Sequence, residues 1–344
     1  MTLPQSLPPD MLAIAIDAPG GPDMLVPHRM ALPNYGANDV LIRVAAAGVN
    51  GPDLAQRRGL YDPPPGASPL PGLEVAGEIA ALGGDVADLK PGQKVMALTN
   101  GGGYAEYAAV PAGQVLPVPV GWSLVEAAAL PETWFTITQT LVMRAGLRKG
   151  MFVLVHGASG GIGGAAIQIA GILGARAIAV VSDTAKGAYC LSLGAEAIID
   201  RTREQIVDRV MSITDGHGAD RIVDLIGGDI ARLNVEAAAR NGHIVQVSTL
   251  GGGTAELPLR QMMAKGLTLS GSTLRPQDAQ TKAAIARHMQ DNLLPALAAR
   301  DWPRPAITTF SLEDAAKAHA LMEGRSHYGK LILTTAFGAG DKPT

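Results

Sequence analysis

The pattern of hydrophobic and polar residues changes near residue 128, where short apolar segments give way to longer ones that repeat. Before this point the apolar segments are separated by turns rich in glycine and proline, with almost no helical period. The predicted strands are Met11–Ile16, Val40–Val49, Glu74–Leu82, Lys94–Leu98 and Tyr104–Val110. Short strands at this spacing predict a β-rich domain that is partly closed as a barrel.

Strands and helices alternate in the middle of the chain. The segment Leu124–Ala145 predicts one or two helices with a break at Pro131, because proline interrupts helical hydrogen bonding. After it come predicted strands at Phe152–His156, Ala177–Ser182, Ala197–Asp200, Arg221–Ile226, His243–Ser248 and Leu267–Thr273, with helices from about Gly161 and at Thr184–Leu193, Arg203–Thr214 and Ile230–Ala239. This alternation predicts βαβ units around a parallel sheet.

The last part of the chain does not continue the alternation. It predicts a long amphipathic helix at Ala279–Ala299, a strand at Ala306–Phe310, a helix at Leu312–Glu323 and an isolated strand at Lys330–Thr334. Because that strand lacks the βα rhythm, we expect the tail to return to the first domain. The predicted organisation is one domain of residues 1–128 and 275–344 and a second domain of residues 129–274.

A glycine-rich turn opens the first unit of the parallel sheet. A dinucleotide-binding turn needs glycine for a tight bend, for close approach of the backbone to pyrophosphate, and for close packing of helix on strand. The fingerprint positions fall on Ala158, Gly160 and Gly163, so alanine replaces the first glycine. The alternative is a tight turn without a ligand, but the βαβ context favours dinucleotide binding. The residues expected to hold the pyrophosphate are Ser159, Gly160, Gly161, Ile162 and Gly163.

The residues after the second and third strands select between the two nicotinamide dinucleotides. An acidic residue there binds a ribose 2′-hydroxyl, whereas a basic residue pairs with a 2′-phosphate. The chain has Ser182 and Asp183 after one strand, Lys186 shortly beyond them and Arg201 after the next strand. Two cations favour NADP as the cofactor, with Asp183 facing solvent or capping the following helix.

Composition and charge exclude several other classes of protein. Hydrophobic residues make up 47% of the chain and charged residues 17%, which is typical of compact α/β proteins. The formal net charge of -3 gives no reason to expect a nucleic-acid or membrane partner. The single cysteine, Cys190, excludes an internal disulfide and a four-cysteine zinc site. Neither a secretory signal nor an apolar run of membrane-spanning length is present, so we expect a cytoplasmic protein.

Several motifs together carry a family resemblance. They are Asn50–Tyr61, Asp62–Gly77, Val155–Gly163, Ser248–Gly253 and Gly271–Arg275. In this order they resemble the zinc-independent quinone oxidoreductases of the medium-chain dehydrogenase/reductase superfamily, the branch that includes zeta-crystallin. The resemblance implies an α/β fold in which a GroES-like β-rich catalytic domain carries an inserted Rossmann domain with a doubly wound parallel sheet. It also implies a homodimer in which the strands Leu267–Thr273 of two subunits pair.

The resemblance is to members that use no metal. Zinc-dependent relatives hold zinc with a cysteine at the position of Asn50 and a histidine at the position of Leu73, and neither residue here replaces those ligands. The histidines show no ligand spacing either, so no metal is expected. Without a Lewis acid, the acceptor must spread the charge of an incoming hydride over a conjugated system. Quinones and α,β-unsaturated carbonyls meet this requirement.

The resemblance assigns candidate roles to residues of the first domain. Tyr61 would donate its hydroxyl to the acceptor oxygen, and Asn50 would position the ribose or the acceptor. From the residues alone, Asn50 is also typical of a turn that bonds its own backbone, and Tyr61 of a ring packed against prolines. Asp53 is expected to cap a helix or to orient Arg57 or Arg58.

A further set of residues is expected to contact the nicotinamide half of the cofactor. By resemblance these residues are Thr136, Ser248, Leu250, Gly251, Ser272, Leu274 and Lys330. Most of them follow predicted parallel strands, where ligands bind in open α/β sheets. Thr136 is otherwise a helix residue bonded to its own backbone, and Lys330 a solvated strand end. Glu74, beside the missing zinc histidine, is expected to pair with an arginine.

The expected activity is that of an NADPH-dependent quinone oxidoreductase acting on a small-molecule quinone or enone. A 2-alkenal or enoyl reductase is the first alternative, because acceptor choice depends on the shape of the cleft rather than on a motif. A catalytically idle NADPH-binding protein, as among crystallin-type relatives, is the second alternative.

Overall fold

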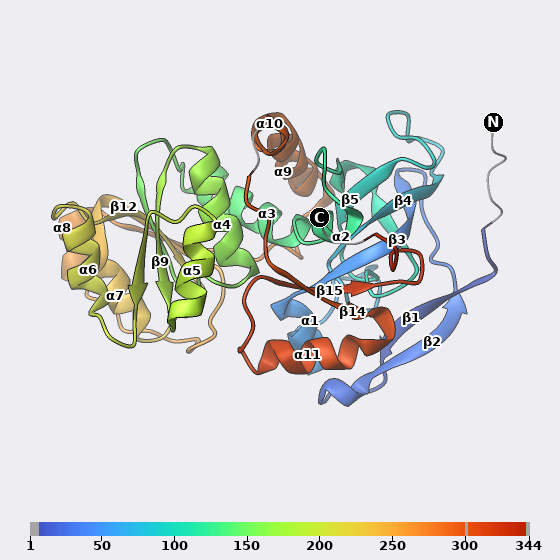
Figure 1. Cartoon of the computed structure of the whole chain (residues 1–344), viewed down its shortest axis with the longest axis horizontal. Helices are drawn as coiled ribbons and strands as arrows, with labels where there is room; N and C mark the ends of the chain where they lie inside the picture. The colour runs from blue at the N-terminus through green and yellow to red at the C-terminus, as the bar shows by residue number, and fades with distance from the viewer. Residues whose placement is uncertain (1–6, 300–301, 342–344) are drawn as a thin grey trace. The chain divides into compact units, whose positions relative to one another are not determined.

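The computed structural model describes residues 7–299 and 302–341, with side chains at all of these except Ala299 (Figure 1). The first six residues of the predicted N-terminal domain and the last three of the chain lie outside this description. The chain divides into two compact units. The first runs to Phe135 and resumes at Arg275, and the second runs from Thr136 to Leu274 and also includes the short segment 302–304.

Strand β3 (Asp39–Val49) organises the sheet of the first unit. It pairs antiparallel with β4 (Glu74–Leu82) over most of its length, with β6 (Tyr107–Pro111) along its first half and with β15 (Lys330–Thr334) at its end. Since β6 pairs with residues 39–43 of β3 and β15 with residues 46–49, these two strands follow one another along β3, which is how one strand pairs with three neighbours. The described sheet has the order β14-β15-β3-β4-β5-β7 with β6 beside β3, so the two ends of the chain share one sheet.

The remaining elements of the first unit complete this framework. The strands are β1 (Asp10–Ile16), β2 (Leu25–Ala31), β5 (Lys94–Leu98), β7 (Val115–Pro117) and β14 (Ile307–Ser311), and the helices are α1 (Gly51–Arg57), α2 (Leu124–Ala127), α3 (Pro131–Ile137), α9 (Ala279–Asn292), α10 (Leu294–Ala299) and α11 (Ala315–Glu323), with short 3-10 turns η1 (Pro22–Met24), η2 (Ala112–Gln114) and η4 (Leu312–Asp314). The single predicted helix Ala279–Ala299 is thus two helices. The second one starts just before Pro295, where proline is tolerated because a first-turn N–H needs no helical partner.

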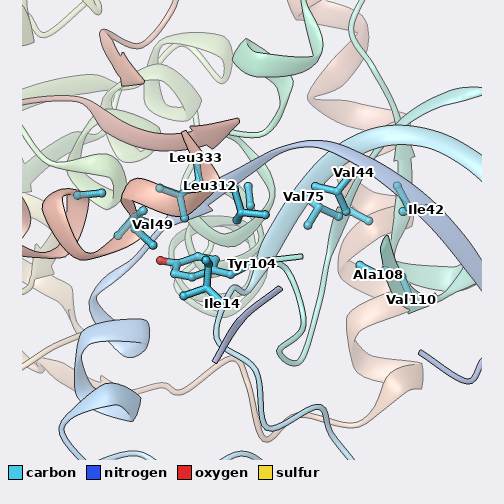
Figure 2. Packing of buried hydrophobic residues seen from close by; sticks show 14 of the residues in the cluster. Ile14, Ile42, Val44, Val49, Val75, Tyr104, Ala108, Val110, Leu312 and Leu333 are labelled. Carbon is cyan, nitrogen blue, oxygen red and sulfur yellow. The ribbon is translucent and has the colours of Figure 1, made fainter. Parts of the chain in front are cut away.

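The core of the first unit joins strands that are distant in sequence. Figure 2 shows Val44 of β3 beside Val75 of β4, and Tyr104 beside Ile14 of β1. Alternate residues of each strand point to this side, as the period of two requires. Leu333 of β15 joins the same cluster, so burial of apolar area holds the C-terminal strand in place.

The second unit is an all-parallel sheet with helices on both faces. Its strands are β8 (Phe152–Val155), β9 (Arg176–Val181), β10 (Ala197–Asp200), β11 (Ala219–Asp224), β12 (Ala238–Gln246) and β13 (Thr268–Gly271), and its helical elements are η3 (Thr138–Arg144), α4 (Gly161–Ile172), α5 (Thr184–Ser192), α6 (Ile206–Ile213), α7 (Ile230–Ala237) and α8 (Leu259–Lys265). Figure 1 shows α4 and α5 on one face of the sheet and α6 and α7 on the other. This confirms the predicted doubly wound fold.

The order of the strands locates the place for a ligand. Within the described chain it is β10-β9-β8-β11-β12-β13, so the connections leave β8 in one direction and β11 in the other. In open α/β sheets, ligands bind at the carboxyl ends of the strands beside such a switch point. No helix among the described residues has both the length and the apolar character needed to span a bilayer.

Candidate active site

The turn between β8 and α4 has the shape that the glycine pattern predicts. Gly157 adopts φ 65°, a left-handed conformation that favours glycine, and α4 begins at Gly161. A Cβ added to Gly163 would lie 2.4 Å from Cα of Ala158, so the helix packs directly on the turn. Ala158 is itself fully buried. The alanine at the first fingerprint position is therefore accommodated because Gly163 has no side chain.

The start of α4 fits a dinucleotide pyrophosphate. The first N–H groups of a helix have no partner within the helix, and its dipole makes this end positive. In α4 these groups belong to Gly161, Ile162 and Gly163, two of them without a side chain in the way. The predicted residues thus include the N–H groups that could hold a phosphate group.

Asp183 caps helix α5. Its Oδ1 accepts a hydrogen bond from the N–H of Lys186 at 2.9 Å, and its Oδ2 lies 3.5 Å from the Lys186 ammonium. The Lys186 N–H bond holds the pKa of Asp183 below its ordinary value. The expectation that Asp183 caps the helix is confirmed. Exposed Arg201, whose N–H bonds the Val181 carbonyl, stands beside the same strand end.

The loops after β11 and β12 are fastened to each other. The N–H of Leu250 bonds the carbonyl of Leu225 at 3.1 Å, and the N–H of Gly251 bonds the carbonyl of Ile226 at 2.7 Å. A Cβ at Gly251 would lie 2.8 Å from Ile226, so glycine permits this close approach. The candidate residues Ser248, Leu250 and Gly251 thus belong to one braced loop.

A π-helical segment brings polar side chains to the end of β13. In η3, the Oε1 atom of Gln139 accepts from the Ser272 hydroxyl at 3.0 Å, and the Thr140 hydroxyl donates to the Thr136 carbonyl at 2.7 Å. π-helical turns occur often at functional sites. Thr136 and Leu274 are buried, whereas Ser272 is partly exposed.

The candidate cofactor residues of the second unit therefore meet at one edge of its sheet. They follow β8, β9, β10, β12 and β13, whose carboxyl ends all point the same way because the strands are parallel. Members of the set are Ser159, Gly160, Ser182, Lys186, Arg201, Ser248, Leu250, Gly251, Ser272 and Leu274.

Asn50, Glu74 and Lys330 form a buried polar cluster in the first unit. The Lys330 ammonium donates to Oδ1 of Asn50 at 2.7 Å and to Oε1 of Glu74, and the Asn50 amide donates to Glu74 at 2.8 Å. Lys330 is only 3% exposed, so the alternative of a solvated strand end is wrong. The expected pairing of Glu74 with an arginine is also wrong, because its cation is Lys330.

Tyr61 lies against a buried guanidinium group. Cζ of Arg275 is 5.5 Å from the centre of the half-buried Tyr61 ring, within the range of a cation–π contact. Arg275 also bonds Gln56 at 2.8 Å and the Asn100 carbonyl at 2.8 Å, which fixes its position. Burial raises the pKa of Tyr61, and the charge of Arg275 opposes this shift. Lys282, whose pKa burial lowers to about 8, bonds the Asn100 side chain at 2.6 Å.

Asp53 belongs to a second buried network of hydrogen bonds, which runs through Tyr104 and His319 to Arg57. Its carboxylate accepts from the N–H groups of Asn50 at 2.8 Å and Gly72 at 2.9 Å, and lies 3.3 Å from the Tyr104 hydroxyl. Tyr104 bonds His319, which contacts Arg57. Burial raises the pKa of Asp53 to about 6 and lowers that of His319 to about 3. The N-cap of α1 is Asn50, and Asp53 lies at the third helical position, where it bonds the Asn50 N–H, so the expectation that Asp53 itself caps the helix is wrong. Arg57 and Arg58 both pair with Glu323 instead of with Asp53.

Glu132 is an acid that sequence reasoning missed. It lies in the first turn of α3, where an acidic residue suits the helix dipole, so its position alone is unremarkable in sequence. Its N–H bonds the Glu74 carboxylate at 2.9 Å, and its side chain is buried. Burial and then the charges of Glu74 and Asp53 raise the pKa of Glu132 to about 8. The site therefore contains a carboxylic acid that keeps its proton at neutral pH.

The raised pKa of Glu132 predicts a fall in stability with pH. Because the ordinary pKa is 4.5 and the folded value about 8, the folded state keeps a proton that the unfolded chain has released. The contribution of this carboxyl to stability is thus greatest below pH 4.5 and declines as pH rises toward 8. Lys282, whose pKa burial lowers to about 8, titrates in the same range with the opposite sign, so the contribution of Glu132 is measured as the difference from a variant that cannot ionise. We expect the free energy of unfolding of wild type to fall by roughly 1–2 kcal/mol relative to that variant between pH 6.5 and 8.

The Glu132→Gln variant tests whether this pH dependence of stability comes from the Glu132 carboxyl. Glutamine has the shape of the protonated acid but cannot ionise, so the free energy of unfolding of the variant, measured with denaturant, should lack the fall that Glu132 contributes across the same window. Glu313→Gln, at an exposed carboxylate, serves as the control and should keep the wild-type slope. An unchanged slope in Glu132→Gln would show that this carboxyl does not hold its proton in the folded state.

Comparisons with known proteins agree with this architecture. Residues 36–120 match the family model described as "Alcohol dehydrogenase GroES-like domain", and residues 161–289 match "Zinc-binding dehydrogenase". The chain belongs to the medium-chain dehydrogenase/reductase superfamily. It is 32% identical to the quinone oxidoreductase of Mus musculus over 94% of this chain and 97% of that protein.

Solved structures give the same result. A probable oxidoreductase from Mycobacterium abscessus matches with TM-score 0.80 and 32% identity, covering 95% of this chain and all of that one. A mycobacterial protein complexed with NADPH matches with TM-score 0.81 and 26% identity, covering 94% of this chain and 100% of that one. The fold predicted from the motifs is therefore confirmed, and the chain is an oxidoreductase of this superfamily.

A catalytic zinc ion does not fit the donors present. Asn50 stands where zinc-dependent relatives have cysteine, and its carbonyl oxygen accepts from the Lys330 ammonium. Leu73, at the histidine position, is a buried apolar side chain. In the part of the chain that the structure describes, no three His, Cys, Asp or Glu side chains gather as a metal site requires. Glu74, which follows Leu73, is bonded instead to the buried ammonium of Lys330.

Proposed function

We propose that the protein is an NADPH-dependent reductase of quinones or related conjugated carbonyls. The observation that carries the proposal is the edge of the second unit, where residues after five parallel strands converge beside the Ala158–Gly163 packing. Relatives named quinone oxidoreductase, about 30% identical over nearly their whole length, support the choice of acceptor.

The residues of this edge suit NADPH. The start of α4 would hold the pyrophosphate, and Ser182, Lys186 and Arg201 would hold the 2′-phosphate. Asp183 is engaged in capping α5, which weakens the case for a ribose diol at this position. The bound cofactor would supply a hydride to the acceptor. Equal affinity for NADH and NADPH, measured by fluorescence titration, would overturn this assignment.

The chain's own residues would orient the acceptor and deliver a proton. Reduction of a quinone or enone adds a hydride and one proton, and the proton would come from the Tyr61 hydroxyl. Arg275 beside the ring stabilises the resulting phenolate until solvent restores the proton. Both ends of the Asn50 amide are engaged, so we propose that Asn50 and Lys330 shape the site together rather than transfer a proton.

Replacement of Tyr61 by phenylalanine tests the proposed proton donor. We expect kcat/KM for a quinone with NADPH to fall about 10²-fold or more, because a positioned acid contributes that much. The Kd for NADPH should stay within about twofold, since Tyr61 belongs to the acceptor side of the proposal. Tyr35→Phe, at an exposed tyrosine, is the matched control. Unchanged turnover in Tyr61→Phe would remove this residue from the site.

The same assays separate the alternatives. Steady-state rates with NADPH against ortho-quinones, para-quinones and 2-alkenals rank the acceptors directly. Faster turnover of alkenals than of any quinone would support the alkenal reductase. Binding of NADPH without turnover of any conjugated acceptor would support the idle protein.

The edge strand β13 is the proposed dimer contact. It pairs with β12 on one side, and its Leu269 is 42% exposed. Leu259 and Met263 of α8 are exposed apolar residues as well. We expect a homodimer by light scattering and expect Leu269→Lys to shift it to monomer, because two buried charges would face each other. Val120→Lys, at an exposed apolar residue of the first unit, should remain dimeric. A monomeric wild-type protein would contradict this interface.

A further inference from the structure

Three buried polar side chains, those of Asp224, Asn234 and His156, form a hydrogen-bonded chain at the switch point of the second unit. Asp224, at the end of β11, accepts from the side-chain amide of Asn234 on α7 at 2.8 Å. The Oδ1 atom of Asn234 lies 2.7 Å from Nε2 of His156, which follows β8. Asp224, Asn234 and His156 are each 1% exposed or less. Buried polar groups left unpaired are costly, so these three side chains depend on one another.

The order of donors and acceptors in this chain is determined. The second carboxylate oxygen of Asp224 accepts from the N–H groups of Ile226 at 2.6 Å and Gly227 at 3.0 Å. A carboxylate only accepts, so Asn234 must turn its NH2 group toward Asp224 and its oxygen toward His156. His156 must then carry its proton on Nε2. Burial lowers the pKa of His156, which keeps the ring neutral.

Asp224 also anchors the two loops that follow β11 and β12. Its carboxylate holds the turn at Ile226 and Gly227, and its carbonyl accepts from the N–H of Val247 at 2.8 Å. This turn also holds the loop after β12, because the carbonyls of Leu225 and Ile226 accept from the N–H groups of Leu250 and Gly251. Asp224 thus connects β8 and α7 to the loop that carries three candidate cofactor residues.

We propose that the Asp224–Asn234–His156 chain is a positioning device that sets the cofactor loop at Ser248–Gly251 for binding of the dinucleotide. The inference rests on the proposed function for the identity of the ligand. None of the three side chains is assigned a contact with the cofactor. Their effect passes through the backbone of the two loops, and the chain requires one histidine tautomer.

The Asp224→Asn variant breaks the order of donors. The new amide must point its oxygen at the N–H groups of Ile226 and Gly227, so its NH2 group faces that of Asn234. Relief requires Asn234 to turn over and His156 to move its proton to Nδ1. We expect the Kd for NADPH to rise about tenfold or more, as loss of a buried hydrogen bond implies. The ring 15N shifts of His156 should report the change of tautomer.

A second substitution restores the order. In Asp224→Asn combined with Asn234→Asp, the new amide donates to the new carboxylate, which accepts from Nε2 of His156, and the total charge is unchanged. We expect the Kd for NADPH to return to within about threefold of wild type, together with the Nε2–H signal. General destabilisation does not predict this rescue. Val210→Ala, at a buried residue of α6, is the control for stability and should leave the Kd unchanged.

Each result has one meaning. If wild type binds NADPH and Asp224→Asn binds it equally well, or if the double variant stays as impaired as the single one, the inference is overturned. A wild-type His156 protonated on Nδ1 overturns it as well, even if a variant does not fold. Failure of wild type to bind NADPH at all would instead overturn the proposed function, and with it the ligand named here.

Discussion

Gly163→Ala is expected to remove measurable NADPH binding. The added Cβ would lie 2.4 Å from Cα of Ala158 and 2.5 Å from its carbonyl oxygen, distances that real Cβ atoms do not show. Both obstacles are backbone, so the start of α4 must move away from the turn. We expect a loss of at least about 2 kcal/mol of stability from overpacking. An NADPH affinity weakened about a hundredfold or more should accompany it, because the helix N-terminus no longer faces the pyrophosphate.

Fluorescence titration and thermal unfolding measure the two effects of Gly163→Ala. Gly84→Ala is the matched control, since a Cβ there meets no atom within 4 Å and the glycine is exposed. It should bind NADPH and unfold as wild type does. If Gly163→Ala bound NADPH with wild-type affinity, the close packing on Ala158 would not be a condition of binding.

Lys330→Met is expected to cause the second large effect. It leaves the carboxylate of Glu74, which is fully buried, without its cation. Removal of one partner of a buried pair typically costs about 3–5 kcal/mol, because an uncompensated charge remains. The Asn50 amide also loses its donor, so quinone turnover should fall together with stability. Denaturant unfolding measures the first effect and initial rates the second.

Two further variants separate burial from charge in this result. Lys330→Met combined with Glu74→Gln removes both charges and should recover part of the lost stability. Lys317→Met breaks the exposed pair with Asp314, in which the lysine side chain is 73% exposed, and should cost less than about 1 kcal/mol. Equal losses in Lys317→Met and Lys330→Met would contradict the account of the buried pair.

Periodicity predicts the second unit well because its elements are local. The strand Ala197–Asp200 lies where the pattern places it, and the predicted strand Phe152–His156 is observed as Phe152–Val155. In a βαβ series each strand is buried on both faces, so the apolar run itself marks the element. The turn at Gly157 can also be predicted from the sequence, because its conformation depends on neighbouring residues.

The polar networks cannot be predicted in this way. Glu74 meets Lys330, and Tyr104 meets His319, across more than two hundred residues each. A buried charge pair leaves no period in sequence, and a lysine at a strand end is ordinarily solvated. Asp224 has one weak signal, an acid that ends an apolar strand. Helix α1 shows no apolar period because its inward face is mostly polar, with Arg57 fully buried, so Asp53 alone signals a helix there.

The fingerprint turn shows how structure sharpens a motif. In sequence, alanine at the first glycine position weakens the match. In the structure, Ala158 lies directly beneath Gly163, so the third glycine provides the space that the helix needs to pack on it. The pattern of three glycines is thus one solution to close packing, and this chain uses another. The identity of the acceptor has no such local signature.

The measurement that tests the central claim most directly is the oxidation of NADPH, followed at 340 nm, by the purified protein after treatment with a metal chelator, with and without a quinone such as 1,2-naphthoquinone. We predict acceptor-dependent oxidation that persists after chelation and slows with NADPH deuterated at the transferred position. Absence of acceptor-dependent oxidation with every quinone and enone tested would contradict the proposed function.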